Sequence, residues 1–497
     1  MTHKKSLEEL LEECNKEKLH LCGHIQPFGA LLGIQKSDGI ITYVSENIDK
    51  FLHVSSKKLL GHKLETLFSS LDTLATDFLK RDSKENFIYQ TWLYKENMLD
   101  IKLSHAREHL LIEFENSFHE DFRSHDGLQL GIELLKAPIN EKEIIPYGEI
   151  LLKGIFETTH YDRVMLYQFH EDWSGEVICE ITKEGLGSYL GLRFPASDIP
   201  SIARELYLKN PFRHIADTTA ENIPILSLDE STPDLTYSDT RSVSPVHIEY
   251  MNNMGMQGSF STPIIVFGEL WGLVACHNQK PRYIGVIPRN NARSLAHSFA
   301  IGISSLLTNE KLQKLDSTDR HLEIIFEKIA QYEDVLDGIE SYEDPLFSLV
   351  NADGFTIVID ENLLSIGEVP SEEAIGPFDS WFTKVFGQNT FSTDSLNQTV
   401  LKNSLIAQNV AGILSIKTKT QSGKNIRCYW FRNELKQEIA WAGNPDKPII
   451  ENAGATRLSP RRSFERWIEV KSGYAKAWNR LDLVMSTKLI KTLNKWL

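Results

Sequence analysis

The sequence feature that most constrains the fold is a long helical segment in the middle of the chain. Residues 291–336 contain no proline, and apolar side chains recur at helical spacing through most of the segment. These positions are Ile301, Ile303, Leu306, Leu307, Leu312, Leu315, Leu322, Ile325, Phe326 and Ile329. A helix of this length commonly forms a coiled coil or a spine between domains. The alternative is two shorter core helices, with a break and a cap at residues 317–319.

The region before this helix mixes short strand and helix patterns. Residues 29–35 and 40–44 predict two strands joined by a Ser-Asp-Gly turn, and a helical stretch then runs to His53 with Ser45 as its expected N-cap. Further along, residues 150–158 and 201–209 predict helices, 163–169 and 176–180 predict strands, and 264–276 predict a hairpin. The expected fold class is α+β, in which antiparallel sheets are flanked by helices.

The region after the helix shows a similar mixture of short strand and helix patterns. Residues 346–350 and 355–359 predict strands around an Asn-Ala-Asp-Gly turn, and residues 472–497 predict a final helix. Its apolar stripe consists of Leu481, Val484, Met485, Leu489 and Leu493. No glycine or capping signal closes this helix, so we expect it to continue into a longer protein.

Composition excludes several classes of protein. The length of 497 residues predicts two to four domains. The net charge of −15 argues against a general nucleic-acid binder, which needs a basic face. The five cysteines include no CxxC pair, so neither a structural zinc site nor a disulfide framework is expected. The N-terminus lacks the apolar core of a signal peptide and no stretch of about 18 apolar residues occurs, which predicts a cytoplasmic protein without a membrane span.

Motifs of the common enzyme classes are also missing from the sequence. It has no GxSxG, HExxH, Walker or GxGxxG element, so neither a catalytic nucleophile nor a nucleotide loop can be assigned. We therefore predict a chain that is not itself an enzyme and holds no metal.

Two segments carry a possible binding site. In residues 191–200, GLRFPASDIP, two prolines bracket Asp198 and hold backbone carbonyls in a fixed, non-helical path. Such a loop suits a ligand with several converging N–H donors. The alternative is a rigid loop in which Asp198 or Ser201 merely caps the following helix.

The second segment, residues 241–262, places Arg241 near several small hydroxyl side chains, which together suit a carboxylate. His247 and Tyr250 share a face if the segment is helical, although a histidine in this setting is often a satisfied core residue. His277 ends a buried strand, where its side chain can point into a pocket.

Together these segments resemble the phytochromes. Residues 191–200 match the PASDIP signature, 241–262 resemble the chromophore-pocket helix, and 270–277 resemble the strand that closes the pocket. The N-terminal CNKEKLHLCGHIQPFGALL resembles the cysteine and lasso region of bacterial phytochromes, and residues 441–443 and 460–464 resemble the two tongue motifs.

The resemblance implies three tandem domains. An N-terminal extension and PAS domain would occupy residues 1–130, a chromophore-binding GAF domain 131–312, and a PHY domain 313–497, with a tongue at about 421–472 and a C-terminal output helix. It also implies a figure-of-eight knot in which the lasso passes Ile25 and its neighbours through a GAF loop, a rare feature in proteins.

The implied cofactor is biliverdin IXα, a linear tetrapyrrole attached through a thioether to Cys14. Plant and cyanobacterial members use a cysteine at the position of Val246 instead. Cys22 stands where a proline is common, so it is either an inert small residue or a competing attachment site. Phe28 and Asn278 replace histidines that are usual in the family, and neither change should remove the pocket.

The resemblance also implies roles around the cofactor. The carbonyl of Asp198 and, through a water, His247 would accept from the pyrrole nitrogens, and His277 would bond the ring-D carbonyl. The remaining cofactor-binding residues would be the propionate clamps Arg213, Arg241, Ser244, Ser259 and Ser261, the aromatic cage Tyr167, Phe194, Tyr207 and Tyr250, and Ile199.

The implied mechanism is Z-to-E isomerisation of the bond between rings C and D. Arg461 would pair with Asp198 in the dark state and Ser463 would take its place in the lit state, while the tongue refolds. Trp441, Gly443, Pro460 and Phe464 complete the predicted switch residues. Leu192 stands where relatives with a far-red ground state carry glutamine, which favours a red-absorbing ground state.

The resemblance implies a homodimer formed through the long helices. It also implies a histidine-kinase output module, absent from this chain, and a response regulator as partners. No nucleic-acid or membrane partner is implied. Two other hypotheses are a sensor that has lost its bilin and only dimerises, and a cyclase or kinase enzyme. The presence of Cys14 and Asp198 argues against the first, and the missing nucleotide loop argues against the second.

Overall fold

The computed structural model describes residues 18–81, 85–117, 130–342, 349–445, 449–452, 455–458, 461 and 463–496. The chain divides into two compact units. Unit 1 comprises Met1–Leu306 with Ala440–Trp467, and unit 2 comprises Leu307–Ile439 with Ile468–Leu497. The predicted α+β class with antiparallel sheets is confirmed in both units.

The first sheet of unit 1 has the strand order β1-β11-β3-β2-β6-β5-β4. Its strands are β1 (His24–Ile25), β2 (Gly29–Gln35), β3 (Ile41–Ser45), β4 (Phe87–Tyr94), β5 (Asn97–Ala106), β6 (His109–Asn116) and β11 (Ile223–Ser227). Four helices accompany it, α2 (Asp49–Leu52), α3 (Ser56–Leu59), α4 (Leu64–Leu67) and α5 (Ser69–Lys80). Both strands predicted at this end of the chain are present, β2 with the predicted bounds.

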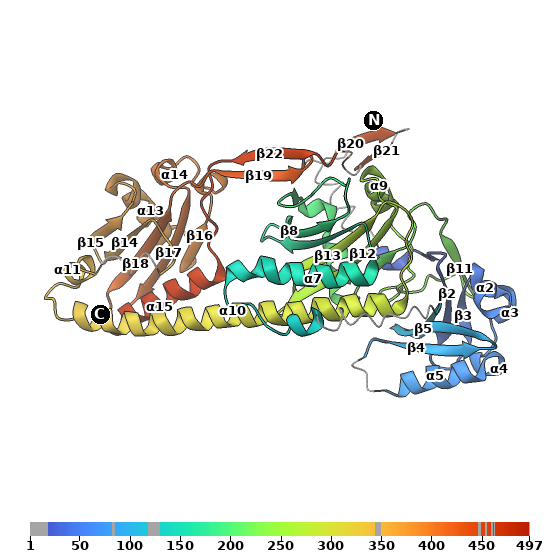
Figure 1. The fold of residues 1–497 in the computed structure, drawn as a ribbon. Coiled ribbons are helices and arrows are strands. Elements are labelled where there is room, and N and C mark those ends of the chain that lie inside the picture. The colour runs from blue at the N-terminus through green and yellow to red at the C-terminus, as the bar shows by residue number, and fades with distance from the viewer. Residues whose placement is uncertain are drawn as a thin grey trace. The chain divides into compact units, whose positions relative to one another are not determined.

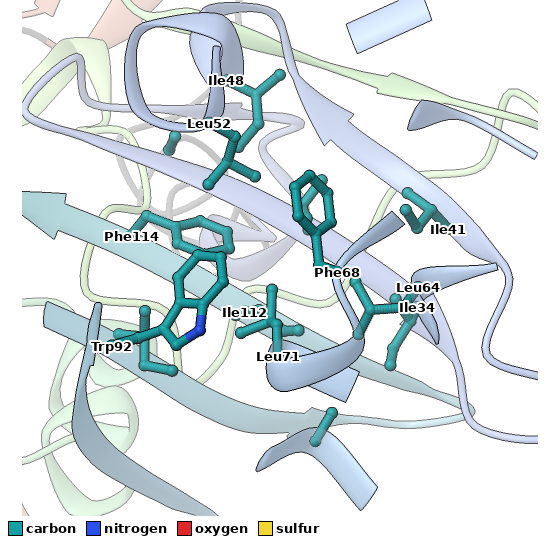
Figure 2. Packing of buried hydrophobic residues seen from close by; sticks show 14 of the residues in the cluster. Ile34, Ile41, Ile48, Leu52, Leu64, Phe68, Leu71, Trp92, Ile112 and Phe114 are labelled. Carbon is teal, nitrogen blue, oxygen red and sulfur yellow. The ribbon is translucent and has the colours of Figure 1, made fainter. Parts of the chain in front are cut away.

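The core of this sheet lies between its strands and the short helices. Figure 2 shows Phe68 and Leu71, from the start of α5, packed against Trp92, Ile112 and Phe114 of the sheet. One expectation was wrong. Ser45 makes no side-chain capping bond to the helical stretch that follows, because its hydroxyl accepts a hydrogen bond from the backbone N–H of Leu31 at 2.9 Å.

The second sheet has the order β10-β12-β13-β7-β8-β9-β19-β22. The strands are β7 (Arg163–Phe169), β8 (Gly175–Thr182), β9 (Arg193–Phe194), β10 (Arg213–Ile215), β12 (Gly258–Val266), β13 (Glu269–Asn278), β19 (Gln437–Ala442) and β22 (Arg466–Lys471). Helix α7 (Ile144–Thr159) contacts β7 and β8, and α8 (Ser201–Lys209) contacts β12 and β13. The predicted bounds of β7 and α8 are those observed, and the predicted hairpin is β12–β13.

Helix α10 is continuous from Val286 to Ile329, over 44 residues. The alternative of a break at residues 317–319 is therefore wrong. The helix begins earlier than predicted, because Pro288 is tolerated in a first turn, where its missing N–H costs no hydrogen bond. It ends before Leu336, because the carboxylate of Asp334 accepts from Leu336 N at 2.8 Å and starts a separate helix, α11 (Val335–Glu340). Figure 1 shows α10 as the long yellow helix.

The sheet of unit 2 has the order β15-β14-β18-β17-β16. Its strands are β14 (Gly354–Ile359), β15 (Asn362–Gly367), β16 (Thr390–Thr393), β17 (Gly412–Lys419) and β18 (Asn425–Arg432). Both faces are covered. Ile357, Leu414 and Trp430 pack with residues of α10 and α15 (Arg480–Trp496), whereas Ile413 and Tyr429 pack with α13 (Glu372–Lys384) and α14 (Leu405–Asn409).

Three expectations concern this region. The strand predicted at 346–350 lies mostly outside the described residues, and 349 and 350 form a turn. The last helix begins at Arg480 instead of residue 472, since Asn479 and Asp482 cap its start with two reciprocal bonds of 2.9 and 3.0 Å. The predicted tongue range of 421–472 includes β18, a strand of this sheet, as well as the two-stranded β20 (Ile449–Asn452) and β21 (Ala455–Leu458).

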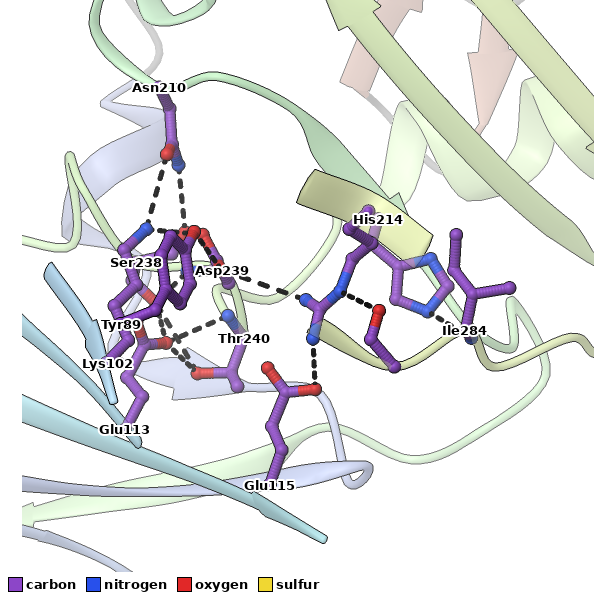
Figure 3. A network of polar contacts seen from close by, with 12 residues as sticks. Tyr89, Lys102, Glu113, Glu115, Asn210, His214, Ser238, Asp239, Thr240 and Ile284 are labelled. Atoms are coloured by element: carbon purple, nitrogen blue, oxygen red, sulfur yellow. Dashed lines mark hydrogen bonds and ion pairs between the residues drawn. The ribbon is translucent and has the colours of Figure 1, made fainter. Parts of the chain in front are cut away.

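A buried ion network joins three parts of unit 1 that are distant in sequence (Figure 3). Asp239, from the segment between β11 and α9 (Pro245–Asn253), binds Lys102 of β5 at 2.5 Å and lies 3.7 Å from Arg289 in the first turn of α10. Arg289 also binds Glu115 of β6 at 2.5 Å. These four side chains are at most 5% exposed, so each charge depends on its partners for compensation.

Glu113 extends the network toward the loop that carries Asp239. It accepts from the backbone N–H groups of Asp239 and Thr240 at 3.1 and 2.9 Å, and from the Ser238 hydroxyl at 2.6 Å. The network holds three carboxylates and two cations, and these donors offset the excess negative charge. Strands β5 and β6, loop 238–240 and α10 are therefore held in one arrangement.

We predict that Arg289→Ala destabilises unit 1 by about 3–5 kcal/mol, because it leaves Glu115 buried without its cation and leaves Asp239 with Lys102 alone. Chemical denaturation measures the change in the free energy of unfolding. The matched control is Arg320→Ala on the same helix, whose pair with Asp316 is 72% and 66% exposed and should contribute within about 0.5 kcal/mol. Equal effects of the two variants would contradict the assignment.

Candidate functional site

Unit 1 encloses a cavity of about 1140 Å³. It is lined by β7, β12 and β13, by α8 and α9, by the loop around Asp198, and by residues 18–24. All the predicted cofactor-binding residues that the structure describes line this one cavity. They are Asp198, His247, His277, Arg213, Arg241, Ser244, Ser259, Ser261, Tyr167, Phe194, Tyr207, Tyr250 and Ile199. Cys14 lies outside the described residues.

Strand alternation explains how one wall is formed. Ser259 of β12 pairs with His277 of β13, and Ala275 of β13 pairs with Met165 of β7. Alternate residues of a strand point to the same face, so these side chains form rows along the cavity. Sequence reasoning missed the apolar members of these rows, Met165, Leu273 and Ala275, although the period of two on each strand was a signal that could have found them.

Asp198 has one partner on α9 and another on the segment that includes Arg461. It lies in a 3-10 turn, Ala196–Asp198, between the two prolines. Its carboxylate forms an ion pair with Arg461 and accepts from the hydroxyl of Tyr250 at 3.2 Å. The N-cap position of α8 is occupied by Pro200 without a side-chain capping bond, so the alternative in which Asp198 or Ser201 caps this helix is wrong.

Arg213 and Arg241 in the wall each lack a carboxylate partner within the described part of the chain. Arg213 donates to the carbonyl of Ser242 at 2.8 Å, and its Nη1 is buried without a hydrogen bond. Arg241 donates to the carbonyl of Leu235 at 3.3 Å. Burial lowers the pKa of Arg213 to about 9, and the charge of Arg241 adds to this effect. Because a guanidinium stays protonated in proteins, the lowered pKa means that an anionic ligand would be strongly favoured here.

Two histidines of the cavity wall, His247 and His277, are neutral at pH 7. Burial lowers the pKa of His247 to about 4, with a contribution from Arg213, and it lowers the pKa of His277 to about 3, with contributions from Arg163 and His247. The Nδ1 atom of His277 and the hydroxyl of Tyr167 are buried and have no hydrogen-bond partners in the described part of the chain. The two residues are only 9% and 6% exposed, so bulk water does not satisfy these groups. Such groups call for a polar ligand in the cavity.

Aromatic rings complete the wall. His247 stacks on Tyr250 with ring centroids 5.9 Å apart, and Tyr167 contacts Phe194 at 6.0 Å. The hydroxyl of Tyr207 is 2.6 Å from that of Ser261. These flat side chains leave a slot suited to an extended aromatic ligand.

A segment distant in sequence covers Asp198. Arg461 donates to the carbonyl of Ala442 as well as to the Asp198 carboxylate, and its own carbonyl accepts from Asn253 of α9 at 3.0 Å. Trp441 pairs with Arg193 as a parallel strand neighbour. The neighbouring Gly443 has a φ of +80°, and a Cβ there would lie 2.0 Å from the carbonyl oxygen of Ser463, so only glycine fits.

The remaining predicted switch residues lie around this contact. Phe464 packs edge-on against Tyr250, with ring centroids 5.3 Å apart. Ser463 accepts from the N–H of Glu465 at 3.3 Å, and it is Arg461 that forms the ion pair with Asp198. Pro460 lies outside the described residues.

We predict that the Asp198–Arg461 pair is coupled energetically. In a double-mutant cycle of Asp198→Ala, Arg461→Ala and the double variant, the interaction energy should be about 0.5–3 kcal/mol, since each single change leaves a buried charge unpaired. Denaturation measures the energies, and hydrogen exchange at residues 440–445 should rise in the single variants. The exposed Arg466→Ala, in the same segment, serves as the control, and additive effects would argue against the coupling.

We also predict a pH dependence that comes from His247. The pKa of His247 is about 4 in the folded chain, below its value in the unfolded chain, so protonation of His247 favours unfolding. The stability of the folded chain therefore decreases as the pH falls below about 6.5. In protein prepared without ligand, His247→Gln should lose about 2 kcal/mol less stability than the wild type between about pH 7 and about pH 5. The exposed His297→Gln should behave like the wild type. Identical pH slopes for all three would rule out this role.

Within the described residues, no helix is both long and apolar enough to cross a membrane. Family models match the chain in three places: a PAS fold over residues 14–117, a GAF domain over 149–304 and a phytochrome region over 318–497.

Named relatives agree with these matches. Cyanobacterial phytochrome B of Nostoc sp. is 34% identical over 501 residues, which cover 96% of this chain and 65% of that protein. A bacteriophytochrome of Xanthomonas campestris is 30% identical over 499 residues, which cover 96% of this chain and 77% of that protein. The photosensory core module of the Stigmatella aurantiaca phytochrome superposes with a TM-score of 0.83 at 29% identity, covering 97% of both chains. The chain thus spans about two thirds of the Nostoc protein.

Proposed function

The chain belongs to the phytochrome family, and we propose that it is a red/far-red photoreceptor module that carries biliverdin IXα in the cavity of unit 1. The observation that supports this most is the set of unsatisfied groups on the cavity wall. The guanidinium groups of Arg213 and Arg241 lack carboxylate partners in the described part of the chain, and the buried Nδ1 of His277 and hydroxyl of Tyr167 lack hydrogen bonds. A large, flat ligand with two carboxylates and several polar ring atoms would satisfy all of them.

We assign the propionate groups to Arg213 and Arg241, with the hydroxyls of Ser244, Ser259 and Ser261 as further donors. The arginines have the planar donor geometry that binds carboxylates in pairs. Their charge is not neutralised by a salt bridge in the described part of the chain, so two carboxylates would lower the cost of burying them.

We assign the pyrrole nitrogens to the backbone carbonyl of Asp198 and to His247, and the ring-D carbonyl to His277. Neutral His247 and His277 keep acceptor nitrogens available at pH 7, and burial is the main cause of that neutrality. Bound there, biliverdin would supply light absorption and isomerisation about the double bond between rings C and D. Tyr167, Phe194, Tyr207 and Tyr250 would form a wall that can change rotamers around the moving ring.

The tongue is proposed to have two packings. In the present one, Arg461 holds Asp198, while Trp441 and Gly443 fit against β9 and Ser463. In the other, Ser463 would replace Arg461 as the partner of Asp198. A difference of a few kcal/mol between two packings is enough for such a switch.

The output of the module remains a proposal drawn from the family. We propose domains at 1–130, 131–312 and 313–497, a thioether at Cys14, a homodimer formed by the long helices, and a signal to a histidine-kinase module of a longer cytoplasmic protein. The chain itself would have no catalytic activity.

The test is to express the chain with a biliverdin supply and record an absorbance difference spectrum, dark against red-irradiated. We expect a reversible loss in the red band and a gain in the far-red. The double variant Arg213→Ala/Arg241→Ala should lose most of the bound pigment, whereas the exposed Arg320→Ala should retain it. Absence of visible pigment from the wild-type chain would overturn the proposal.

A further inference from the structure

Cys22 brings a second thiol to the cavity. We propose that Cys22 is itself a covalent attachment site for a vinyl group of the bilin, able to form a thioether when Cys14 does not. The inference rests on the proposed function, because it assumes a bilin in this cavity. It concerns a position at which this chain departs from the family pattern, which commonly has a proline there.

The backbone on either side of Cys22 is held by unit 1. The carbonyl of His20 accepts from Leu235 N at 2.8 Å, that of Gly23 accepts from Ile225 N at 3.0 Å, and that of His24 accepts from Ser242 N at 3.1 Å. Ile25 and Arg241 form an isolated β-bridge. The fold of unit 1 therefore positions the thiol on the cavity wall.

The thiol itself is available to a ligand. Cys22 is partly exposed, lines the cavity and is not in a disulfide. Its Sγ donates to the carbonyl of His24 at 3.4 Å, which is a weak interaction for an S–H group. This partner leaves the sulfur free to form a bond from the cavity side.

The cavity supplies a second and independent indication of a ligand near this thiol. The buried Nδ1 of His277 and hydroxyl of Tyr167 have no partners, so the cavity is built for a polar molecule. Cys22 lies within electrostatic reach of Arg213 and Arg241, and all three residues line the cavity. A ligand whose carboxylates bind these arginines is thus held beside Cys22, and such positioning accelerates bond formation.

The other cysteines of the described chain do not compete for this role. Cys179, Cys276 and Cys428 are buried, and none lines the cavity. Burial raises the pKa of Cys179 to about 12 and also raises the pKa of the other two thiols. Their sulfur atoms are thus kept protonated and away from the ligand.

The reaction is an addition and needs no oxidant or reductant. The Cys22 sulfur bonds to one carbon of the vinyl group, the C=C double bond becomes single, and the thiol proton is transferred to the other vinyl carbon. The product has the summed mass of chain and bilin. Loss of one conjugated double bond shifts the absorbance to shorter wavelength than that of the same bilin bound without a covalent bond.

The two candidate cysteines can be distinguished by peptide mapping. Trypsin cleaves after Lys16 and Lys18, so Cys14 falls in peptide 6–16 and Cys22 in peptide 19–36. The wild-type chain and the variants Cys14→Ala, Cys22→Ala, Cys14→Ala/Cys22→Ala and Cys14→Ala/Cys22→Ser are loaded with biliverdin, denatured, digested and analysed by mass spectrometry. The matched control is Cys14→Ala/Cys428→Ala, which removes a thiol that does not line the cavity.

We expect Cys14→Ala to carry covalent bilin on peptide 19–36, and the control to do the same. Cys14→Ala/Cys22→Ala and Cys14→Ala/Cys22→Ser should keep pigment that denaturation releases, which shows that both remain folded. Cys14→Ala with bound but fully releasable pigment would overturn this inference and leave the proposed function standing. A wild-type chain with no pigment would overturn the proposed function and the inference with it.

Discussion

The rest of unit 1 depends on the buried charges that join Lys102, Glu115, Asp239 and Arg289. Their side chains are at most 5% exposed, so the charges must meet one another whenever this unit folds. The loop that contains Asp239 continues directly into Arg241, whose N–H donates to the Ser238 hydroxyl at 2.9 Å. The network thus positions one of the two cationic groups of the cavity.

The same network reaches the other side of the cavity. Lys102 Nζ lies 3.4 Å from the side-chain oxygen of Asn210, which is near Arg213 in the chain. Gln26 donates from its side chain to the carbonyls of His214 and Arg241, at 2.9 and 3.2 Å, and so connects the N-terminal segment to both. Hydrogen bonds therefore connect the contacts that stabilise the fold to the segments that carry Arg213 and Arg241.

The cavity wall itself lowers stability. Burying Arg213 and Arg241 without carboxylates, and leaving the Nδ1 of His277 and the hydroxyl of Tyr167 without hydrogen bonds, costs free energy in the absence of a ligand. Sites built for a ligand commonly carry such a cost. The ion network of Lys102, Glu115, Asp239 and Arg289, which lies outside the cavity, offsets this cost in free energy. Asp198 connects the cavity wall to the segment that includes Arg461. Its turn lies in the wall, and its carboxylate binds Arg461.

The sequence alone determined the local elements and the choice of cavity residues. Strand β7 and helix α8 have their predicted bounds because hydrophobic periodicity and proline act within a few residues. The motifs around Asp198, His247 and His277 were sufficient to select side chains that line one cavity. The family resemblance implied that Asp198 pairs with Arg461, 263 residues away, and the structure contains this pair. Tertiary structure alone decided other pairings between distant segments, such as Asp239 with Lys102, 137 residues apart. Tertiary structure also decided that the Ser45 hydroxyl accepts from the backbone N–H of Leu31 instead of capping the following helix. It decided as well that Cys22 lines the cavity. Each of these contacts depends on where the chain returns, and local spacing carries no information about that path.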